Sequence, residues 1–426
     1  MSLTKKPATG MKDILPEEMA IRDYCISVIE KTYGSFGFSH IETPCVEHIE
    51  NLCSNQGGEN EKLIFKVMKR GEKLNIADAK CENDLADAGL RYDLTLPLAR
   101  FYSNNQASLP APFKALQMGN VFRAERPQKG RFRQFMQCDI DILGEASNLA
   151  EIELILATTT LLSKLDFKNF RVKINERKIL KAMTAYAGFK AEETDAVFII
   201  LDKMDKIGAD GVKEDLIANG FDAAVVEKYM ALFEEMKTST DGSVIATLDF
   251  LEGKLQGFIE DGVIENLKEI FISVNAAKSA DCELVFDPTL VRGMGYYTGT
   301  IYEIEMAELN CSVAGGGRYD KMIGKFTGND TPACGFSIGF ERIITIMLEK
   351  GFKIPGEDAK VAFLVEKGID SERMGEIIKE ASVLRNEGKT VLVARMNKNK
   401  KFQKDTLTAQ GYTEFKDFYR EALKYD

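Results

Sequence analysis

The chain is 426 residues long, 45% of them apolar, and carries a formal net charge of −10. This length exceeds that of one domain and allows a large core with at least one smaller unit. The acidic balance argues against a protein that coats nucleic acid indiscriminately, because such binding depends on neutralising phosphates. The first thirty residues hold no apolar stretch of signal-peptide length, and no run of about eighteen apolar residues follows, so we expect a cytoplasmic protein without a membrane span.

Cysteine and histidine usage constrains the chemistry open to this chain. Its eight cysteines are scattered without a C-x-x-C pair, and only His40 and His48 offer imidazole ligands. We therefore expect no zinc site, and reduced thiols fit this spacing better than disulfides do. Because general-base catalysis most often uses histidine, its scarcity directs attention to arginine, carboxylate and metal chemistry.

The first third of the chain predicts a helix followed by a largely antiparallel sheet. Apolar residues recur at helical spacing over 17–36, and the extended stretch 38–45 is predicted as an edge strand. Further predicted elements are a hairpin over 63–77, a strand over 90–96 that leads into a helix, and a hairpin over 113–143 with its turn at 127–130. Strands with few helices between them favour antiparallel pairing.

The pattern changes over 179–280, where four segments carry apolar residues at helical spacing and predict a helical insertion. Strand patterns return over 282–306 and again near Gly335, before a further helix. Because strands stand on both sides of the helical block, we expect them to belong to one domain. The linker-like stretch 351–359 precedes a small α/β unit, in which 390–426 is predicted to hold one strand and one or two short helices.

The segment FRAERPQKGRFRQFMQCDIDILG is the most informative part of the sequence. Its cations gather around one turn: Arg123, Arg126, Lys129, Arg131 and Arg133. A strand that starts at Arg131 would place these polar side chains on one face: Arg131, Arg133, Gln137, Asp139 and Asp141. Cations at one end and carboxylates at the other suit a zwitterionic amino acid beside a polyphosphate, since arginine binds phosphate oxygens in pairs. A solvated sheet face is the alternative interpretation.

Two glycine-rich clusters follow. LVRGMGYYTGTIYEIE sets Arg292 among glycines and before Tyr296 and Tyr297. Adjacent strand tyrosines point to opposite faces, so only one of the pair is expected to face a ligand squarely; a strand entry with core tyrosines is the alternative. ACGFSIGFERI sets Arg342 near a helix start beside two glycines, where a planar base and a phosphate would fit, and the alternative for Arg342 is a surface cap.

Taken together, these segments resemble the histidyl-tRNA synthetase family. GMKDILP at 10–16, IETP ending at Pro44, FRAERPQKGRFRQF, LVRGMGYYTGT, GGGRYD at 315–320 and GFSIGFER at 335–342 occur in the family's order. The resemblance implies an α+β fold, with a class II synthetase-type antiparallel sheet, flanking helices, a helical insertion and a small C-terminal α/β domain. It also implies a catalytic core in two parts (1–178 and 281–350), an insertion (179–280) and a short anticodon-binding-like domain (360–426).

The resemblance further implies a reaction and its residues. Histidine and ATP would form histidyl-adenylate, and the terminal ribose of a histidine tRNA would then take the histidyl group, with Mg²⁺ bridging the triphosphate. A homodimer is implied, and no metal site of the protein's own. The implied residues are catalytic Arg292 and Arg123; histidine-binding Asp93, Thr95, Gln137, Asp141, Tyr296 and Tyr297; ATP-binding Arg123, Arg131 and Arg342; and tRNA-binding Arg126 and Gln128.

Three departures from the family pattern accompany the resemblance. Gly295 stands where many members have an aspartate, Met136 stands where a histidine is common, and the segment after Ala359 is shorter than the usual anticodon-binding domain. The short segment favours a synthetase-like regulatory subunit of ATP phosphoribosyltransferase, which the intact Arg292 opposes. A class II synthetase for another amino acid is the third possibility, and the paired tyrosines with the GGGRYD loop oppose it.

Overall fold

A computed structural model describes residues 3–53, 60–127, 132–240, 242–293, 296–306, 311–355 and 360–420. Its contacts group the chain into two units, one made of Met1–Ile14 and Arg22–Lys350 and the other of Leu15–Ile21 and Gly351–Asp426. Gln128, Arg131 and Gly295, named above, lie outside the described residues.

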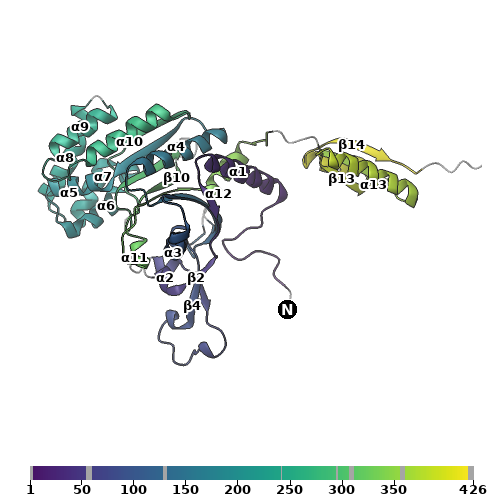
Figure 1. The fold of residues 1–426 in the computed structure, drawn as a ribbon, viewed down its shortest axis with the longest axis horizontal. Helices are drawn as coiled ribbons and strands as arrows, with labels where there is room; N and C mark the ends of the chain where they lie inside the picture. The colour runs from purple at the N-terminus through teal and green to yellow at the C-terminus, as the bar shows by residue number, and fades with distance from the viewer. Residues whose placement is uncertain are drawn as a thin grey trace, which may run out of the picture. The chain divides into compact units, whose positions relative to one another are not determined.

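An eight-stranded sheet runs through the first unit (Figure 1), with strand order β1-β5-β6-β11-β10-β9-β7-β8. Its strands are β1 (Ser39–Ile41), β5 (Phe113–Phe122), β6 (Gln134–Leu143), β7 (Phe170–Glu176), β8 (Cys282–Phe286), β9 (Thr300–Met306), β10 (Cys311–Arg318) and β11 (Ala333–Ile338). The β1–β5 and β7–β8 pairs are parallel and the other pairs are antiparallel. A mainly antiparallel sheet with β1 at its edge, built from strands on both sides of the helical block, is thus confirmed.

Helices cover the apolar face of the central strands. Alternate residues of β6, such as Ile140 and Ile142, are fully or almost fully buried, and β6 contacts α4 (Leu149–Lys164) and α12 (Phe340–Glu349). Helix α1 (Pro16–Ser35) matches the predicted helix, and its Cys25 contacts Met347 of α12. Because side chains alternate along a strand, the opposite face of β6 is left for polar residues.

The segment after β7 is helical, as its periodicity predicts. Its helices are α5 (Arg177–Ala187), α6 (Thr194–Leu201), α7 (Met204–Ala218), α8 (Ala223–Ser239), α9 (Val244–Lys254) and α10 (Val263–Ala277). They gather at one side of the sheet, in teal in Figure 1, and α10 packs against α4. The boundaries of an insertion domain at 179 and 280 remain a prediction.

The predicted hairpin over 63–77 is wrong. Strand β3 (Lys66–Met68) pairs instead with β4 (Ala86–Leu90), which also pairs with β2 (Val46–His48) in a separate three-stranded sheet. Two short 3-10 turns, Gly71–Lys73 and Glu82–Leu85, lie between β3 and β4, and Gly71 has φ +61°. The returning strand therefore comes later than the pattern suggests. The predicted strand over 90–96 likewise ends at Leu90, ahead of α3 (Thr95–Asn105).

The second unit contains a parallel sheet of order β13-β12-β14. Its elements are β12 (Lys360–Val365), α13 (Ser371–Asn386), β13 (Val391–Arg395), α14 (Lys400–Ala409) and β14 (Tyr412–Phe418). Strand β12 is buried on both faces, as a central parallel strand should be. The prediction of one strand within 390–426 is therefore wrong, because the charged residues of β14, TEFKDF, conceal a strand that is only half buried.

Several smaller findings concern the residues that the structure describes. Free thiols are carried by Cys25, Cys45, Cys53, Cys81, Cys138, Cys282 and Cys334. Within the same described ranges, no group of three or more His, Cys, Asp or Glu side chains is arranged to hold a metal ion. No helix in the described part of the chain combines the length and apolar character needed to cross a membrane.

Candidate active site

Two adjoining cavities lie over the sheet, beside β6, β10 and β11. The first, of about 350 Å³, is called here the acidic cavity, because Asp93, Asp139 and Asp141 line it. The second, of about 510 Å³, is called the arginine cavity, because Arg123, Arg292 and Arg342 line it. The two cavities adjoin, because the same residues line both of them: Arg123, Glu125, Gln137, Tyr296, Tyr297, Gly315 and Ser337. A larger cavity of about 770 Å³ lies between β8 and α9, but no predicted site residue lines it.

Strand β6 supplies the polar face of the acidic cavity. Gln137, Asp139 and Asp141 occupy alternate positions and all line it, which confirms that they share one face as cavity lining rather than as solvated sheet. On the neighbouring β11, Ser337 pairs with Asp139 and Gly335 pairs with Asp141. A Cβ atom at Gly335 would lie 2.0 Å from Asp141 Oδ1, so glycine is needed there to leave room for the carboxylate.

Three buried oxygens of this face have no hydrogen-bond partner among the described residues: Gln137 Oε1, Asp139 Oδ1 and Asp141 Oδ2. Burial raises the pKa of Asp139 to about 7 and holds the pKa of Asp141 well above its usual range. Burial also raises the pKa of Asp93. Buried acceptors without donors, next to carboxylates that resist ionisation, suit a ligand that is cationic and donates hydrogen bonds.

Four tyrosines line the acidic cavity: Tyr92, Tyr296, Tyr297 and Tyr319. The ring centroids of Tyr296 and Tyr297 lie 4.3 Å apart. Both residues line both cavities, so they do not lie on opposite faces of a strand as predicted, and which of them faces a ligand stays a prediction. The cause is local, because both backbone N–H groups donate to the carbonyl of Gly293 in a turn, before β9 begins. Tyr319 donates its hydroxyl proton to Asp141 Oδ1 at 2.5 Å.

Arg292 enters the arginine cavity from the loop between β8 and β9. Its Nε donates to Glu303 Oε2 at 2.5 Å, and its Nη2 reaches the same carboxylate and donates to Ser312 Oγ at 2.9 Å. A Cβ atom at Gly315 would lie 2.3 Å from Arg292 Nη1, so the glycine permits the close approach of the guanidinium to β10. Arg292 is thus oriented by a carboxylate on one side and by bare backbone on the other.

Arg123 and Arg342 complete the cationic lining of the arginine cavity. Arg123 follows β5, donates from Nε to the carbonyl of Tyr92 at 3.0 Å and lies over the ring of Phe135. Arg342 lies in the first turn of α12, as predicted, and donates to the carbonyl of Ser312. Three guanidinium groups around one cavity form a setting that favours phosphate and carboxylate oxygens.

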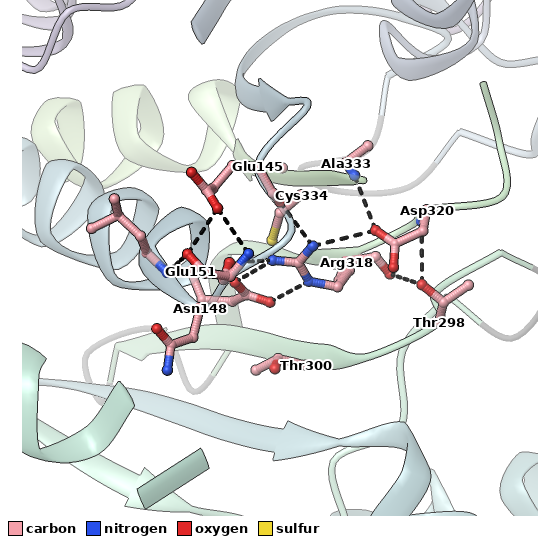
Figure 2. Close-up of polar contacts among 12 residues, drawn as sticks. Glu145, Asn148, Glu151, Thr298, Thr300, Arg318, Asp320, Ala333 and Cys334 are labelled. Atoms are coloured by element: carbon pink, nitrogen blue, oxygen red, sulfur yellow. Dashed lines mark hydrogen bonds and ion pairs between the residues drawn. The ribbon is translucent and has the colours of Figure 1, made fainter. Parts of the chain in front are cut away.

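The arginine of the GGGRYD segment has a different role, outside both cavities (Figure 2). Arg318 donates from Nε and Nη2 to the two carboxylate oxygens of Glu151, at 2.7 and 2.6 Å. It also reaches Asp320 Oδ1 at 3.3 Å, and Asp320 in turn accepts from the N–H of Ala333 and donates its own N–H to Thr298 Oγ1. This cluster ties the start of α4 to β10, β11 and the turn that carries the tyrosine pair, so it supports the wall of the acidic cavity.

The structure brings together most of the predicted site residues. The acidic cavity collects Asp93, Thr95, Arg123, Gln137, Asp141, Tyr296 and Tyr297, and the arginine cavity adds Arg292 and Arg342. Arg126 is exposed and lines neither cavity. Sequence reasoning left several lining or orienting residues without a role, among them Asp139, Glu303, Tyr319 and Ser337. Two of these had a usable signal: Asp139 alternates with Gln137 and Asp141 along β6, and Tyr319 stands in the GGGRYD segment.

Comparisons with known proteins agree with this geometry. A histidyl-tRNA synthetase family model matches residues 10–343. A histidine–tRNA ligase of Leifsonia xyli subsp. xyli is 42% identical over 414 residues, which cover 96% of this chain and 94% of that protein. A probable histidine–tRNA ligase of Tropheryma whipplei is 44% identical over 351 residues, covering 80% of each chain.

Solved structures show the same relationship. A histidyl-tRNA synthetase from Nostoc sp. PCC 7120 superposes with a TM-score of 0.79 at 28% identity, covering 96% of this chain and 90% of that one. An ATP phosphoribosyltransferase regulatory subunit/histidyl-tRNA synthetase from Bacillus halodurans has a TM-score of 0.77 at 19% identity, covering 99% and 100%, which shows a shared fold alone. With its class II sheet, its family motifs in order and relatives above 40% identity, the chain belongs to the histidyl-tRNA synthetase family.

Proposed function

We propose that the chain is a histidine–tRNA ligase, which activates L-histidine with ATP and transfers the histidyl group to the 3′ end of a histidine tRNA. The observation that carries this proposal is the cavity pair, in which buried acceptors without donors lie next to three arginines. A cationic amino acid suits the first cavity, and a polyphosphate suits the second. The names of the relatives supply the identity of the amino acid and the tRNA.

In the acidic cavity, Asp93, Thr95 and Gln137 would hold the α-ammonium group of histidine. Asp141 would accept the imidazole N–H through Oδ2, because Tyr319 already engages Oδ1. Tyr297 would meet the other imidazole nitrogen, with Tyr296 beside it, and burial raises the pKa of Tyr297 to about 12, which keeps its hydroxyl a donor at neutral pH.

In the arginine cavity, Arg342 would stack on adenine and meet the γ-phosphate, while Arg123 and Arg292 would hold the α-phosphate and the histidine carboxylate. We extend the ATP site to Arg131 from its place in the motif alone. Mg²⁺ would accompany the triphosphate, held mainly by phosphate oxygens and water. Of the carboxylates lining this cavity, Glu341 already binds Arg22 and the N–H of Met136, so Glu125 is the better candidate for a magnesium-bound water.

The chemistry fits residues that carry charge without acting as bases. A carboxylate oxygen of histidine attacks the α-phosphorus, the bond to the bridging oxygen breaks, and pyrophosphate leaves. Both reacting groups are anionic, so Arg292 between them lowers their repulsion and stabilises the charge of the transition state. No protein base is required in this step, because the attacking carboxylate is already ionised.

The remaining roles follow from family membership. We propose that Arg126, with Gln128, meets the acceptor end of the tRNA, and the exposure of Arg126 outside the cavities supports this for that residue. We likewise propose a cytoplasmic homodimer, a core formed by 1–178 and 281–350, an insertion over 179–280 and an anticodon-binding-like domain over 360–426. The three-stranded unit β13-β12-β14 supports the last of these assignments.

The test is histidine-dependent ATP–pyrophosphate exchange, followed by charging of a histidine tRNA. Arg292→Ala should fold and lose at least about a hundredfold in exchange, since one electrostatic contact to the transition state contributes on this scale. Arg171→Ala is the matched control, because Arg171 is a half-exposed arginine of β7 that lines neither cavity. Unchanged exchange in Arg292→Ala contradicts the catalytic role, and no exchange by the unmodified protein favours the regulatory-subunit alternative.

A further inference from the structure

Asp139 is the carboxylate of the acidic cavity that the proposed reaction leaves without a role. It lies on β6 between Gln137 and Asp141, its side chain is buried, and its residue exposure is only 4%. Its Oδ2 lies 3.5 Å from Gln137 Nε2, whereas its Oδ1 has no partner among the described residues. A buried carboxylate oxygen without a donor is costly, so its persistence in a cavity lining points to a ligand.

We propose that Asp139 is a second carboxylate for the α-ammonium group of the amino acid, accepting a hydrogen bond through Oδ1 beside Asp93 and Gln137. The inference rests on the proposed function and adds a substrate-binding residue to it. An ammonium group has three N–H donors, and Asp139 would join Asp93, Thr95 and Gln137 around it as an acceptor whose negative charge matches the charge of the ammonium group. The three unpartnered oxygens of the cavity are then divided between the ammonium end and the imidazole end of one ligand.

The position of Asp139 favours the ammonium end over the imidazole end. The side chains of Asp139 and Gln137 converge, since Asp139 Oδ2 lies 3.5 Å from Gln137 Nε2, so the two residues can share one ammonium group. Gln137 Nε2 also lies 3.3 Å from Ser337 Oγ, and Ser337 in turn stands within hydrogen-bonding reach of Asp139. Asp141 is turned toward the tyrosine wall by its bond to Tyr319.

The charges around Asp139 explain why a cation is needed. Carboxylates face it from two elements, Asp93 before α3 and Asp141 on β6, and two cations oppose them, Arg123 after β5 and Arg91 after β4. The guanidinium of Arg91 is already committed to the carbonyls of Thr43 and Asn120. Two other titratable neighbours, Cys138 on β6 and Tyr33 on α1, are neutral at physiological pH, because burial raises their pKa values. Among the described residues that line the acidic cavity, carboxylates therefore outnumber the one arginine, Arg123, until the amino acid enters.

This arrangement couples binding to proton release. With its pKa raised to about 7, Asp139 is partly protonated at neutral pH in the empty cavity. The ammonium group favours the ionised carboxylate, so its arrival lowers the pKa of Asp139 and expels the proton to solvent. Histidine affinity should therefore rise as pH rises through 7 and should weaken toward acid, where the proton has to be removed before the contact forms.

The first experiment compares two ligands by calorimetry on the full chain and on Asp139→Asn. The ligands are L-histidine and the same acid without its amino group, 3-(imidazol-4-yl)propanoate. Asp139→Asn should weaken histidine binding about tenfold or more, since hydrogen bonds to charged groups contribute on that scale, and should change binding of the deaminated acid by less than about threefold. Asp141→Asn is the comparison variant and should weaken both ligands. The proposal is overturned if Asp139→Asn weakens the binding of both ligands equally, or if it leaves the affinity for histidine unchanged.

The second experiment measures protons released on histidine binding at pH 7, from binding heats in two buffers with different ionisation enthalpies. The unmodified protein should release more protons than Asp139→Asn, by roughly half a proton. Equal release from the two proteins overturns the proposal even if the deaminated acid binds too weakly to measure. A thermal unfolding midpoint of Asp139→Asn within a few degrees of the unmodified protein shows that the variant folds. Absence of histidine binding and exchange in the unmodified protein overturns the proposed function as well, whereas normal binding with an indifferent Asp139→Asn overturns this inference alone.

Discussion

Replacing Arg318 by methionine should destabilise the first unit by several kcal/mol without removing any group that lines the cavities. The Glu151 carboxylate would lose both of its donors while its side chain stays 1% exposed. Removing one member of a buried, hydrogen-bonded ion pair costs about 3–5 kcal/mol, because the other charge is left uncompensated. The carbonyls of Glu145 and Ser147, which Arg318 also engages, add to the loss.

The expected loss converts into a measurable shift in unfolding temperature. The first unit spans roughly 340 residues, which implies an unfolding entropy of about 0.7 kcal/mol/K. The midpoint should therefore fall by about 4–7 °C in a calorimetric or circular-dichroism melt. The unfolding midpoint of Arg318→Lys should fall by less, since lysine keeps the charge but cannot form the two parallel hydrogen bonds to Glu151.

A double-mutant cycle separates this pair from general packing loss. Glu151→Gln alone should also destabilise, but Arg318→Met combined with Glu151→Gln should cost clearly less than the sum of the single variants, because no unpaired charge remains. Strict additivity of the three measurements would refute the reasoning. So would a single variant Arg318→Met that melts within a degree of the unmodified protein.

Three further predictions concern the cavity linings. Gly315→Ala places a Cβ 2.3 Å from Arg292 Nη1, so it should lower the rate of ATP–pyrophosphate exchange about tenfold or more with little change in the melting temperature. The control Gly253→Ala, whose Cβ meets nothing within 4 Å, should alter neither quantity. Normal exchange in Gly315→Ala would contradict the described orientation of Arg292. Tyr319→Phe removes the donor to Asp141 and should raise KM for histidine about tenfold while kcat changes little; a loss confined to kcat would point to another role. Glu303→Gln keeps the shape of the side chain but removes the charge that orients Arg292, so kcat for exchange should fall about tenfold in steady-state assays. A higher kcat would mean that Glu303 restrains Arg292 instead.

The short-range patterns of the sequence were sufficient for much of this molecule. Helix α1, the long β5–β6 hairpin strands and the helices between β7 and β8 follow from apolar spacing, because the 3.6- and 2-residue periods are properties of neighbouring residues. The polar face of β6 could be predicted for the same reason, and with it the grouping of Gln137, Asp139 and Asp141. Motif order was enough to indicate the family and nine of the residues that line the two cavities.

Tertiary structure decided the features that depend on partners distant in the sequence. Pairing of β3 with β4, the third strand of the second unit and the turn that aims both Tyr296 and Tyr297 at the cavities were not visible in local patterns. Arg318 finds Glu151 across 167 residues, and Tyr319 finds Asp141 across 178. No local propensity encodes such contacts, because they arise only when the packed sheet brings separate strands together and removes their polar groups from water.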